Sequence, residues 1–99
     1  MTISQALPAS AALTRLDELP CRAKGTIVGI AIQQNGLAHG VAPDELERRL
    51  LEMGFVEGAQ FEILHEGLIG RDPIALKLDD MRVALRRREA VVVIVERAP

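Results

Sequence analysis

Apolar and polar residues alternate in three stretches of this chain, and such alternation is the period of a strand with one buried face. The stretches are residues 61–63, 74–78 and 82–86. Residues 26–32 are rich in β-branched side chains and lie between glycine-containing segments, which also predicts a strand. The final run, residues 91–95, is apolar without alternation, so it predicts a strand covered on both faces or one whose outer face meets a partner.

A helical period occurs in one segment, Pro43–Met53. Leu46, Leu50 and Met53 stand at positions i, i+4 and i+7, which places them on one face of a helix. Pro43 suits the first helical position, where its missing N–H breaks no bond. The charged residues lie mainly on the other faces, so the pattern predicts a helix with a buried stripe and a solvated outer surface.

The local signals outside these elements predict turns. Leu13, Leu16 and Leu19 are spaced by three residues and stop at Pro20, which predicts a short turn or 3₁₀ segment that tucks leucines under the core. Gly29 lies inside a predicted strand and indicates a bend or bulge there.

About five strands and one helix in a short chain predict a mainly β fold, a small, strongly bent antiparallel barrel with one inserted α-helix. A parallel sheet would need repeated crossover helices. Asp79-Asp80 supplies turn chemistry for a hairpin between two of the strands. Residues 1–12 are expected to form a flexible arm, residues 33–42 a mobile connection, and residues 13–99 a single barrel domain.

Length and composition narrow the classes of function. The 99 residues suffice for one hydrophobic core. A formal net charge of −2 gives no positive field for a polyanion, and with two Phe and no Trp or Tyr the chain lacks the usual stacking platforms, so we expect no nucleic acid as partner. The longest apolar run, residues 90–95, is far shorter than the ~20 residues of a membrane-spanning helix, so membrane contact is expected only through a partner.

The cysteine and the histidines indicate neither catalysis nor a bound metal. Cys21 is the single cysteine and has no sign of a base near it, which predicts a small buried or half-buried thiol rather than a nucleophile. His39 and His65 lack metal-ligand spacing, and His65, Glu66 and Asp72 are scattered candidates only. We therefore predict a protein that is not an enzyme and needs no cofactor. The lone cysteine and the lack of a leader-like N-terminus predict a cytoplasmic location.

Two segments are candidates for contact with a partner. Residues 67–73 connect two strands and carry Leu68 and Ile69 between glycines, although connections normally run over the surface. These two side chains are either exposed anchors or fold back to cap the barrel. Residues 86–89, Arg-Arg-Arg-Glu, concentrate charge that could meet a phosphate or an acidic partner.

Several short motifs also follow one another in a recognisable order. They are Arg49-Leu50, Met53-Gly54-Phe55, Gly58, Gly70-Arg71-Asp72-Pro73-Ile74, Ala84-Leu85-Arg86-Arg87 and Glu89-Ala90. In this combination, over about residues 13–95, the chain resembles the FeoA family of small ferrous iron transport proteins. It departs from the family pattern in its N-terminal arm, in the long connection at residues 33–42, in Met53 where leucine is usual, and in Asp79-Asp80 where the family tends to have glycine.

The resemblance implies an SH3-like barrel in the cytoplasm that works with FeoB, the membrane ferrous iron permease that carries a G-protein domain. It also implies that the chain itself is neither an enzyme nor the pore. On this basis we predict a non-catalytic accessory protein of ferrous iron uptake that docks on the cytoplasmic part of the permease. The candidate docking residues are Leu68, Ile69, Arg71, Asp72, Arg86 and Arg87.

Two alternatives stay open at the level of sequence. The C-terminal domain of iron-dependent repressors shares the barrel of this family, so the chain could be a metal-responsive regulatory domain with His39, His65 and Glu66 as ligands. A homodimer is also possible, because the apolar run 91–95 or the connection 67–73 could pair symmetrically with a second copy.

Overall fold

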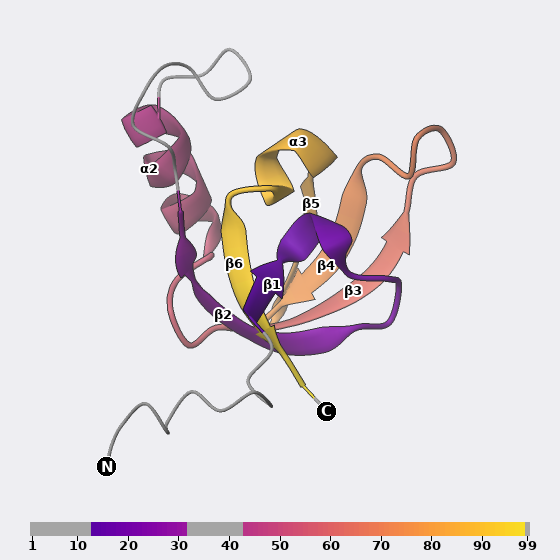
Figure 1. The fold of residues 1–99 in the computed structure, drawn as a ribbon, viewed down its shortest axis with the longest axis horizontal. Coiled ribbons are helices and arrows are strands. Elements are labelled where there is room, and N and C mark those ends of the chain that lie inside the picture. The colour runs from indigo at the N-terminus through magenta and orange to yellow at the C-terminus, as the bar shows by residue number, and fades with distance from the viewer. Residues whose placement is uncertain (1–12, 32–42, 99) are drawn as a thin grey trace.

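The computed structural model describes residues 13–31 and 43–98, and the strands within these ranges form one antiparallel sheet. They are β1 (Leu13–Arg15), β2 (Lys24–Ile30), β3 (Gln60–Glu66), β4 (Ile74–Leu78), β5 (Met81–Leu85) and β6 (Val93–Arg97). The strand order is β1-β6-β2-β3-β4-β5. The sheet curves around its core, with α2 (Pro43–Met53) on one side and the short α3 (Arg87–Ala90) above it in Figure 1. The prediction of a mainly β, antiparallel fold is confirmed.

The α2 helix begins and ends where its sequence pattern predicts. Leu46 and Leu50 are buried, and Met53 packs half-buried against the same core. Gly54 follows the helix with a φ of 113°, a left-handed conformation that glycine adopts without a steric penalty. The Phe55 N–H then donates to the Leu50 carbonyl at 3.0 Å, which turns the fully buried Phe55 side chain under the helix.

Alternate positions of the strands face one hydrophobic core. In β4, for example, Ile74, Leu76 and Leu78 are fully buried while Lys77 is exposed. The largest fully buried side chains are Leu16, Ile27, Leu46, Leu50, Phe55, Ile63, Ile74, Leu76, Leu78, Leu85, Val93 and Val95. Burial of each such side chain contributes about 1.5–3 kcal/mol, so this core is the main source of stability.

Two predicted irregularities of the sheet are confirmed. The pairing of β2 with β6 shifts register between Ile27 and Gly29, which is the bulge expected at that glycine. Asp79 turns the hairpin between β4 and β5 with a φ of 54°. Its N–H donates to the Gln60 carbonyl at 2.8 Å and its carboxylate accepts the Gln60 N–H at 3.0 Å, so both backbone groups of Gln60 are satisfied by one residue.

For the final valine run, the predicted boundaries were wrong, and so was the alternative of a strand covered on both faces; an outer face that meets a partner stays a prediction. Residues 87–90 form α3, so Val91 and Val92 leave that helix as a turn and β6 starts only at Val93. Within β6 the buried Val93 and Val95 alternate with the half-exposed Ile94, as in a strand with one buried face. The helix forms because the Glu89 carboxylate accepts the backbone N–H of Arg86 at 3.3 Å, a capping bond that the apolar pattern does not reveal.

The N-terminal part of the described chain gives one confirmation and two corrections. The predicted 3₁₀ turn is present as η1 (Leu16–Glu18), with Leu16 and Leu19 buried. Leu13 instead lies on β1 and is 47% exposed, because β1 is a short edge strand. Cys21 is exposed rather than buried, since it occupies the turn between η1 and β2.

The predicted arm at residues 1–12 and the predicted connection at residues 33–42 lie outside the described residues. Among the helices that are described, none is long and apolar enough to cross a membrane.

Candidate docking surface

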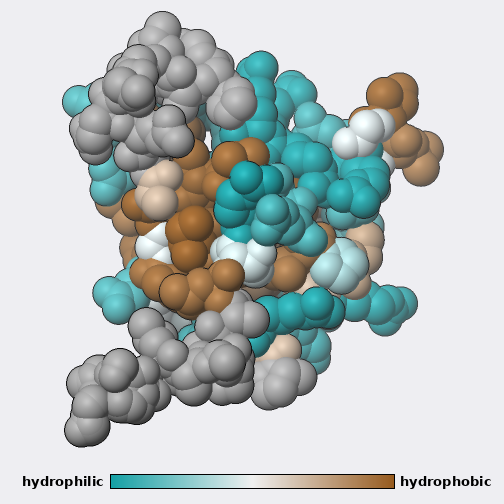
Figure 2. Space-filling model, in the orientation of Figure 1, coloured by the Kyte–Doolittle hydropathy of each residue, from teal (hydrophilic) through white to brown (hydrophobic). Residues whose placement is uncertain are grey.

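The connection between β3 and β4, residues 67–73, projects from one corner of the barrel, where Figure 1 draws it in orange. Leu68 is fully exposed and Ile69 is 87% exposed, whereas Met81, the next most exposed large apolar residue among those described, reaches 51%. Figure 2 shows apolar atoms standing out at this corner beside hydrophilic surface. Of the two alternatives drawn from the sequence, the structure therefore shows the exposed one.

The backbone of residues 67–73 closes on itself through its two ends. The Gly67 N–H donates to the Pro73 carbonyl at 2.9 Å. A Cβ at Gly67 would lie 1.9 Å from the carbonyl oxygen of Asp72, so only glycine fits at this close approach. Gly70 and Arg71 then reverse the chain with φ values of 67° and 56°. The backbone of residues 67–73 therefore forms a closed loop, which holds its tip, Leu68 and Ile69, away from the barrel.

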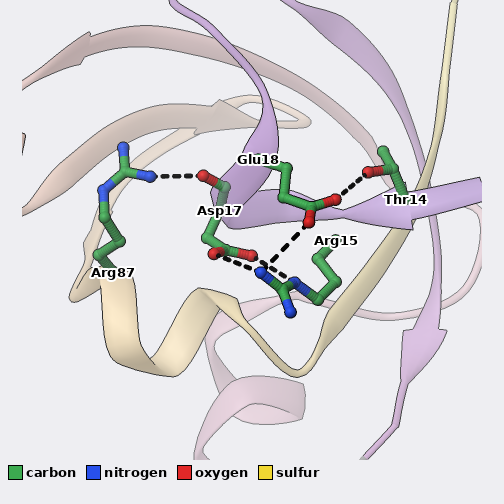
Figure 3. Close-up of polar contacts among 5 residues, drawn as sticks. All are labelled: Thr14, Arg15, Asp17, Glu18 and Arg87. Atoms are coloured by element: carbon green, nitrogen blue, oxygen red, sulfur yellow. Dashed lines mark hydrogen bonds and ion pairs between the residues drawn. The ribbon is translucent and has the colours of Figure 1, made fainter.

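The base of this connection is fixed by Arg87 at the start of α3. One guanidinium nitrogen lies 2.8 Å from the Glu66 carboxylate, and Nε donates to the Arg71 carbonyl at 3.0 Å. The third guanidinium nitrogen donates to the Asp17 carbonyl, a contact drawn in Figure 3. The backbone N–H of Arg87 donates to the Asp72 carboxylate at 2.8 Å. A single arginine thus ties the end of β3, the connection and η1 together.

The carbonyl of Asp17 is presented to Arg87 by a cluster of polar residues around η1 (Figure 3). Arg15 pairs with the Asp17 carboxylate at 3.0 Å and with Glu18 at 3.2 Å. The Thr14 hydroxyl donates to Glu18 at 2.7 Å. This hydroxyl, followed by the charge of Arg15, lowers the pKa of Glu18 below its ordinary value of 4.5. The cluster holds η1 in the orientation that completes the Arg87 contacts.

The other predicted docking residues occupy different positions. Arg71 has a side chain that is 66% exposed, with Nε 3.8 Å from the Glu66 carboxylate. Asp72 is half-buried and accepts the Arg87 N–H. Arg86 is exposed and lines a pocket of about 470 Å³. Arg87 is turned inward, with only 19% of its side chain exposed, so it positions the connection rather than presenting a free charge.

Sequence reasoning missed the contribution of Glu66 and Asp17 to this arrangement. Glu66 was considered only as a metal ligand, and Asp17 was not singled out at all. Their bonds to Arg87 span 21 and 70 residues of sequence, so no local pattern could have paired them.

The candidate metal ligands do not assemble in the part of the chain that the structure describes. No three side chains from His, Cys, Asp and Glu come together there in a way that could hold a metal ion. His65 is exposed, whereas the Glu66 carboxylate forms ion pairs with Arg71 and Arg87. His39 lies outside the described residues.

Comparison with solved structures identifies relatives of the whole barrel. FeoA of Stenotrophomonas maltophilia, solved with zinc and described as an SH3 domain protein that possibly acts as a ferrous iron transport activating factor, is 29% identical, with a TM-score of 0.67 over 84% of this chain and 89% of that one. FeoA of Chlorobium tepidum is 26% identical, with a TM-score of 0.70 over 87% of this chain and 71% of that one. An iron uptake regulatory protein, also named FeoA, is 23% identical with a TM-score of 0.66 and shares the fold over 88% of this chain and 99% of that one.

Metal-dependent repressors share the fold alone. A manganese-dependent transcriptional repressor is 16% identical, with a TM-score of 0.69 over 89% of this chain and 43% of that one. No curated protein sequence matches the chain. The distant repressors therefore do not favour the metal-responsive alternative.

The fold and the exposed connection define the class of this protein as a small SH3-like barrel that carries an apolar projection. The sequence profile of the FeoA domain matches residues 14–97, which is most of the chain. The protein belongs to the FeoA family.

Proposed function

We propose that this protein is a non-catalytic, cytoplasmic accessory factor of ferrous iron uptake that docks on the cytoplasmic part of a FeoB-type iron permease. Membership of the FeoA family supports the link to iron transport. The described relative from S. maltophilia, possibly a transport activating factor, supports an accessory role.

The observation that carries the proposal is the exposure of Leu68 and Ile69 on a fixed support. Exposed apolar side chains are unremarkable when scattered singly, but two adjacent ones on a projecting connection form an anchor. Complete burial of one Leu or Ile is worth about 1.5–3 kcal/mol. Arg87 and the Gly67–Pro73 hydrogen bond already hold the ends of the connection in place, so binding costs little conformational entropy of its backbone.

Calorimetry with the purified cytoplasmic part of the permease tests this docking mode. The double substitution L68S/I69S should weaken binding by about 100-fold, which corresponds to a loss of about 2.7 kcal/mol. The matched control is L51S/V56S, which removes two apolar side chains that are 43% and 44% exposed elsewhere on the surface. This control should keep the affinity within about threefold.

L68S/I69S should unfold at nearly the wild-type temperature, because both of its side chains are almost fully exposed. L51S/V56S removes side chains that are more than half buried, so it should unfold at a somewhat lower temperature while staying folded under the conditions of the calorimetry. Equal affinity of L68S/I69S and wild type would remove the connection from the docking surface. A permease that binds neither the wild-type chain nor the control would contradict the proposed function itself.

A further inference from the structure

A pocket of about 470 Å³ adjoins the connection, and three of its six lining residues are arginines. Its walls come from α2, α3, β5 and the residue that precedes β4. The lining residues are Arg49, Pro73, Ala84, Arg86, Arg88 and Glu89. Figure 1 places α3, which carries two of these residues, between α2 and the connection at residues 67–73. Pro73 is the last residue of that connection, so the pocket adjoins the base of the connection.

The charges of this pocket are unbalanced. It holds three arginines and one glutamate, and so has two positive charges in excess, although the whole chain has a net charge of −2. Glu89 is engaged on both of its oxygens, by the Arg86 N–H at 3.3 Å and by the Arg49 guanidinium at 3.4 Å. In the described part of the chain, no carboxylate pairs with the guanidinium of Arg86 or Arg88. The pocket therefore carries two arginine charges that can pair with anionic groups.

The size of the pocket and its exposure to solvent indicate whether it binds a free anion or a segment of a macromolecule. A single phosphate or carboxylate would fill only a small part of about 470 Å³. Exposed arginine–carboxylate pairs are worth only about 0–1 kcal/mol each, so a free small anion would bind weakly here. Carboxylates on a segment already anchored nearby bind at a high effective concentration, and several weak pairs then add to one interface.

We propose that this pocket receives an acidic segment of the same partner whose apolar site accepts Leu68 and Ile69. Arg86 and Arg88 pair with its carboxylates, while the charge of Arg49 at the wall is balanced by Glu89. The partner predicted in this way is a protein surface that has an apolar site for Leu68 and Ile69 and an acidic segment next to it. This inference rests on the proposed function, because the apolar anchor brings the segment to the pocket.

Two charge reversals of equal size test the assignment in binding experiments with the cytoplasmic part of the permease. R86E/R88E reverses both free arginines of the pocket. R82E/R97E reverses two exposed arginines that do not line it and so changes the net charge equally. At low salt the pocket variant should bind at least tenfold more weakly than this control. The difference should shrink at about 0.5 M salt, where screening shortens the range of charge interactions to a few ångströms.

A partner-independent probe separates this inference from the proposed function. NMR titration of the full chain with a hexaglutamate peptide should shift the Arg86 and Arg88 side-chain resonances, while hexalysine should not. Inorganic phosphate is titrated in parallel to represent a free anion.

The outcomes are distinct. If R86E/R88E binds the permease as well as R82E/R97E does while L68S/I69S loses binding, docking stands and the acidic-segment assignment is overturned. If phosphate binds the pocket more tightly than hexaglutamate, the site is one for a small anion and the assignment is again overturned. If the permease binds no form of the chain, the proposed function fails, and the peptide titration still decides whether the pocket takes acidic segments.

Discussion

Arg87 and Glu66 are 21 residues apart in sequence, yet their guanidinium and carboxylate groups lie 2.8 Å apart and join the start of α3 to the end of β3. Their side chains are only 19% and 14% exposed, so water screens this pair less than a surface ion pair. The same guanidinium also donates to the Arg71 carbonyl at 3.0 Å. The exposed apolar tip is therefore supported by a partly buried hydrogen-bond network at its base.

Replacement of Arg87 by alanine should remove this network and loosen the connection. Hydrogen bonds to charged groups contribute about 1.5–3 kcal/mol each before discounting for exposure, so we expect Arg87→Ala to lower the free energy of unfolding by about 1–3 kcal/mol. Urea denaturation measures this change, and amide hydrogen exchange should accelerate at Gly67 and Asp72, whose N–H groups lie within the connection. The control is Arg86→Ala at the exposed neighbouring position, which should stay within about 0.5 kcal/mol of wild type. Equal stability of the two variants would show that Arg87 contributes nothing to this support.

Periodicity in the sequence predicted most of the fold because each element buries one face. Ile74, Leu76 and Leu78 alternate with exposed or half-exposed residues, and Leu46 and Leu50 recur at helical spacing, so burial follows directly from the pattern. The short α3 has no such signal. Its four residues are too few to show a helical period, and it forms through the capping bond between Glu89 and Arg86 and its contacts with η1.

The candidate docking surface was only partly predictable for a different reason. Two large apolar residues between glycines left two alternatives open, exposed anchors or side chains folded back onto the barrel, and the structure shows Leu68 and Ile69 exposed. The role of Arg87 was not predictable, since an arginine in a charged run gives no sign of whether its side chain turns inward. Its partners Glu66 and Asp17 become neighbours only when β3, η1 and α3 assemble.

Substitution of Gly67 tests the closed loop of the connection. A Cβ there would lie 1.9 Å from the Asp72 carbonyl oxygen and 3.0 Å from the Pro73 nitrogen, both rigid backbone atoms. We expect Gly67→Ala to lower the free energy of unfolding by about 1–3 kcal/mol, because the backbone must move apart and break the bond from Gly67 N–H to the Pro73 carbonyl. Gly29→Ala is the control, since a Cβ at Gly29 meets nothing within 4 Å. Equal unfolding midpoints in urea for the two variants would contradict the steric argument.

Truncation of Phe55 tests how α2 is held on the barrel. Phe55 is fully buried in the core directly after the helix and shares that core with Leu46 and Leu50. Phe55→Ala should cost about 3–5 kcal/mol through lost burial and a residual cavity, enough to unfold much of a marginally stable domain. The neighbouring Val56 is 44% exposed, so Val56→Ala should cost less than about 1 kcal/mol. Thermal unfolding followed by circular dichroism measures both, and a small effect at Phe55 would mean that the helix is held by other contacts.

The hydrogen bond from Thr14 to Glu18 predicts that part of the folding stability is lost at acidic pH. The Thr14 hydroxyl and the Arg15 charge lower the pKa of Glu18 below its ordinary value of 4.5. The stabilisation from the ionised carboxylate is therefore present above that value and is lost as pH falls through the lower pKa of the folded state. Thr14→Val removes the hydroxyl, so the pKa of Glu18 should rise toward the ordinary value while Arg15 still holds it somewhat below. Carbon-detected NMR titration of the Glu18 carboxyl measures this shift. Thr14→Ser, which retains a hydroxyl, should leave the pKa low; a Glu18 titration curve that is the same in the valine variant and the wild type would show that the hydroxyl is not the cause.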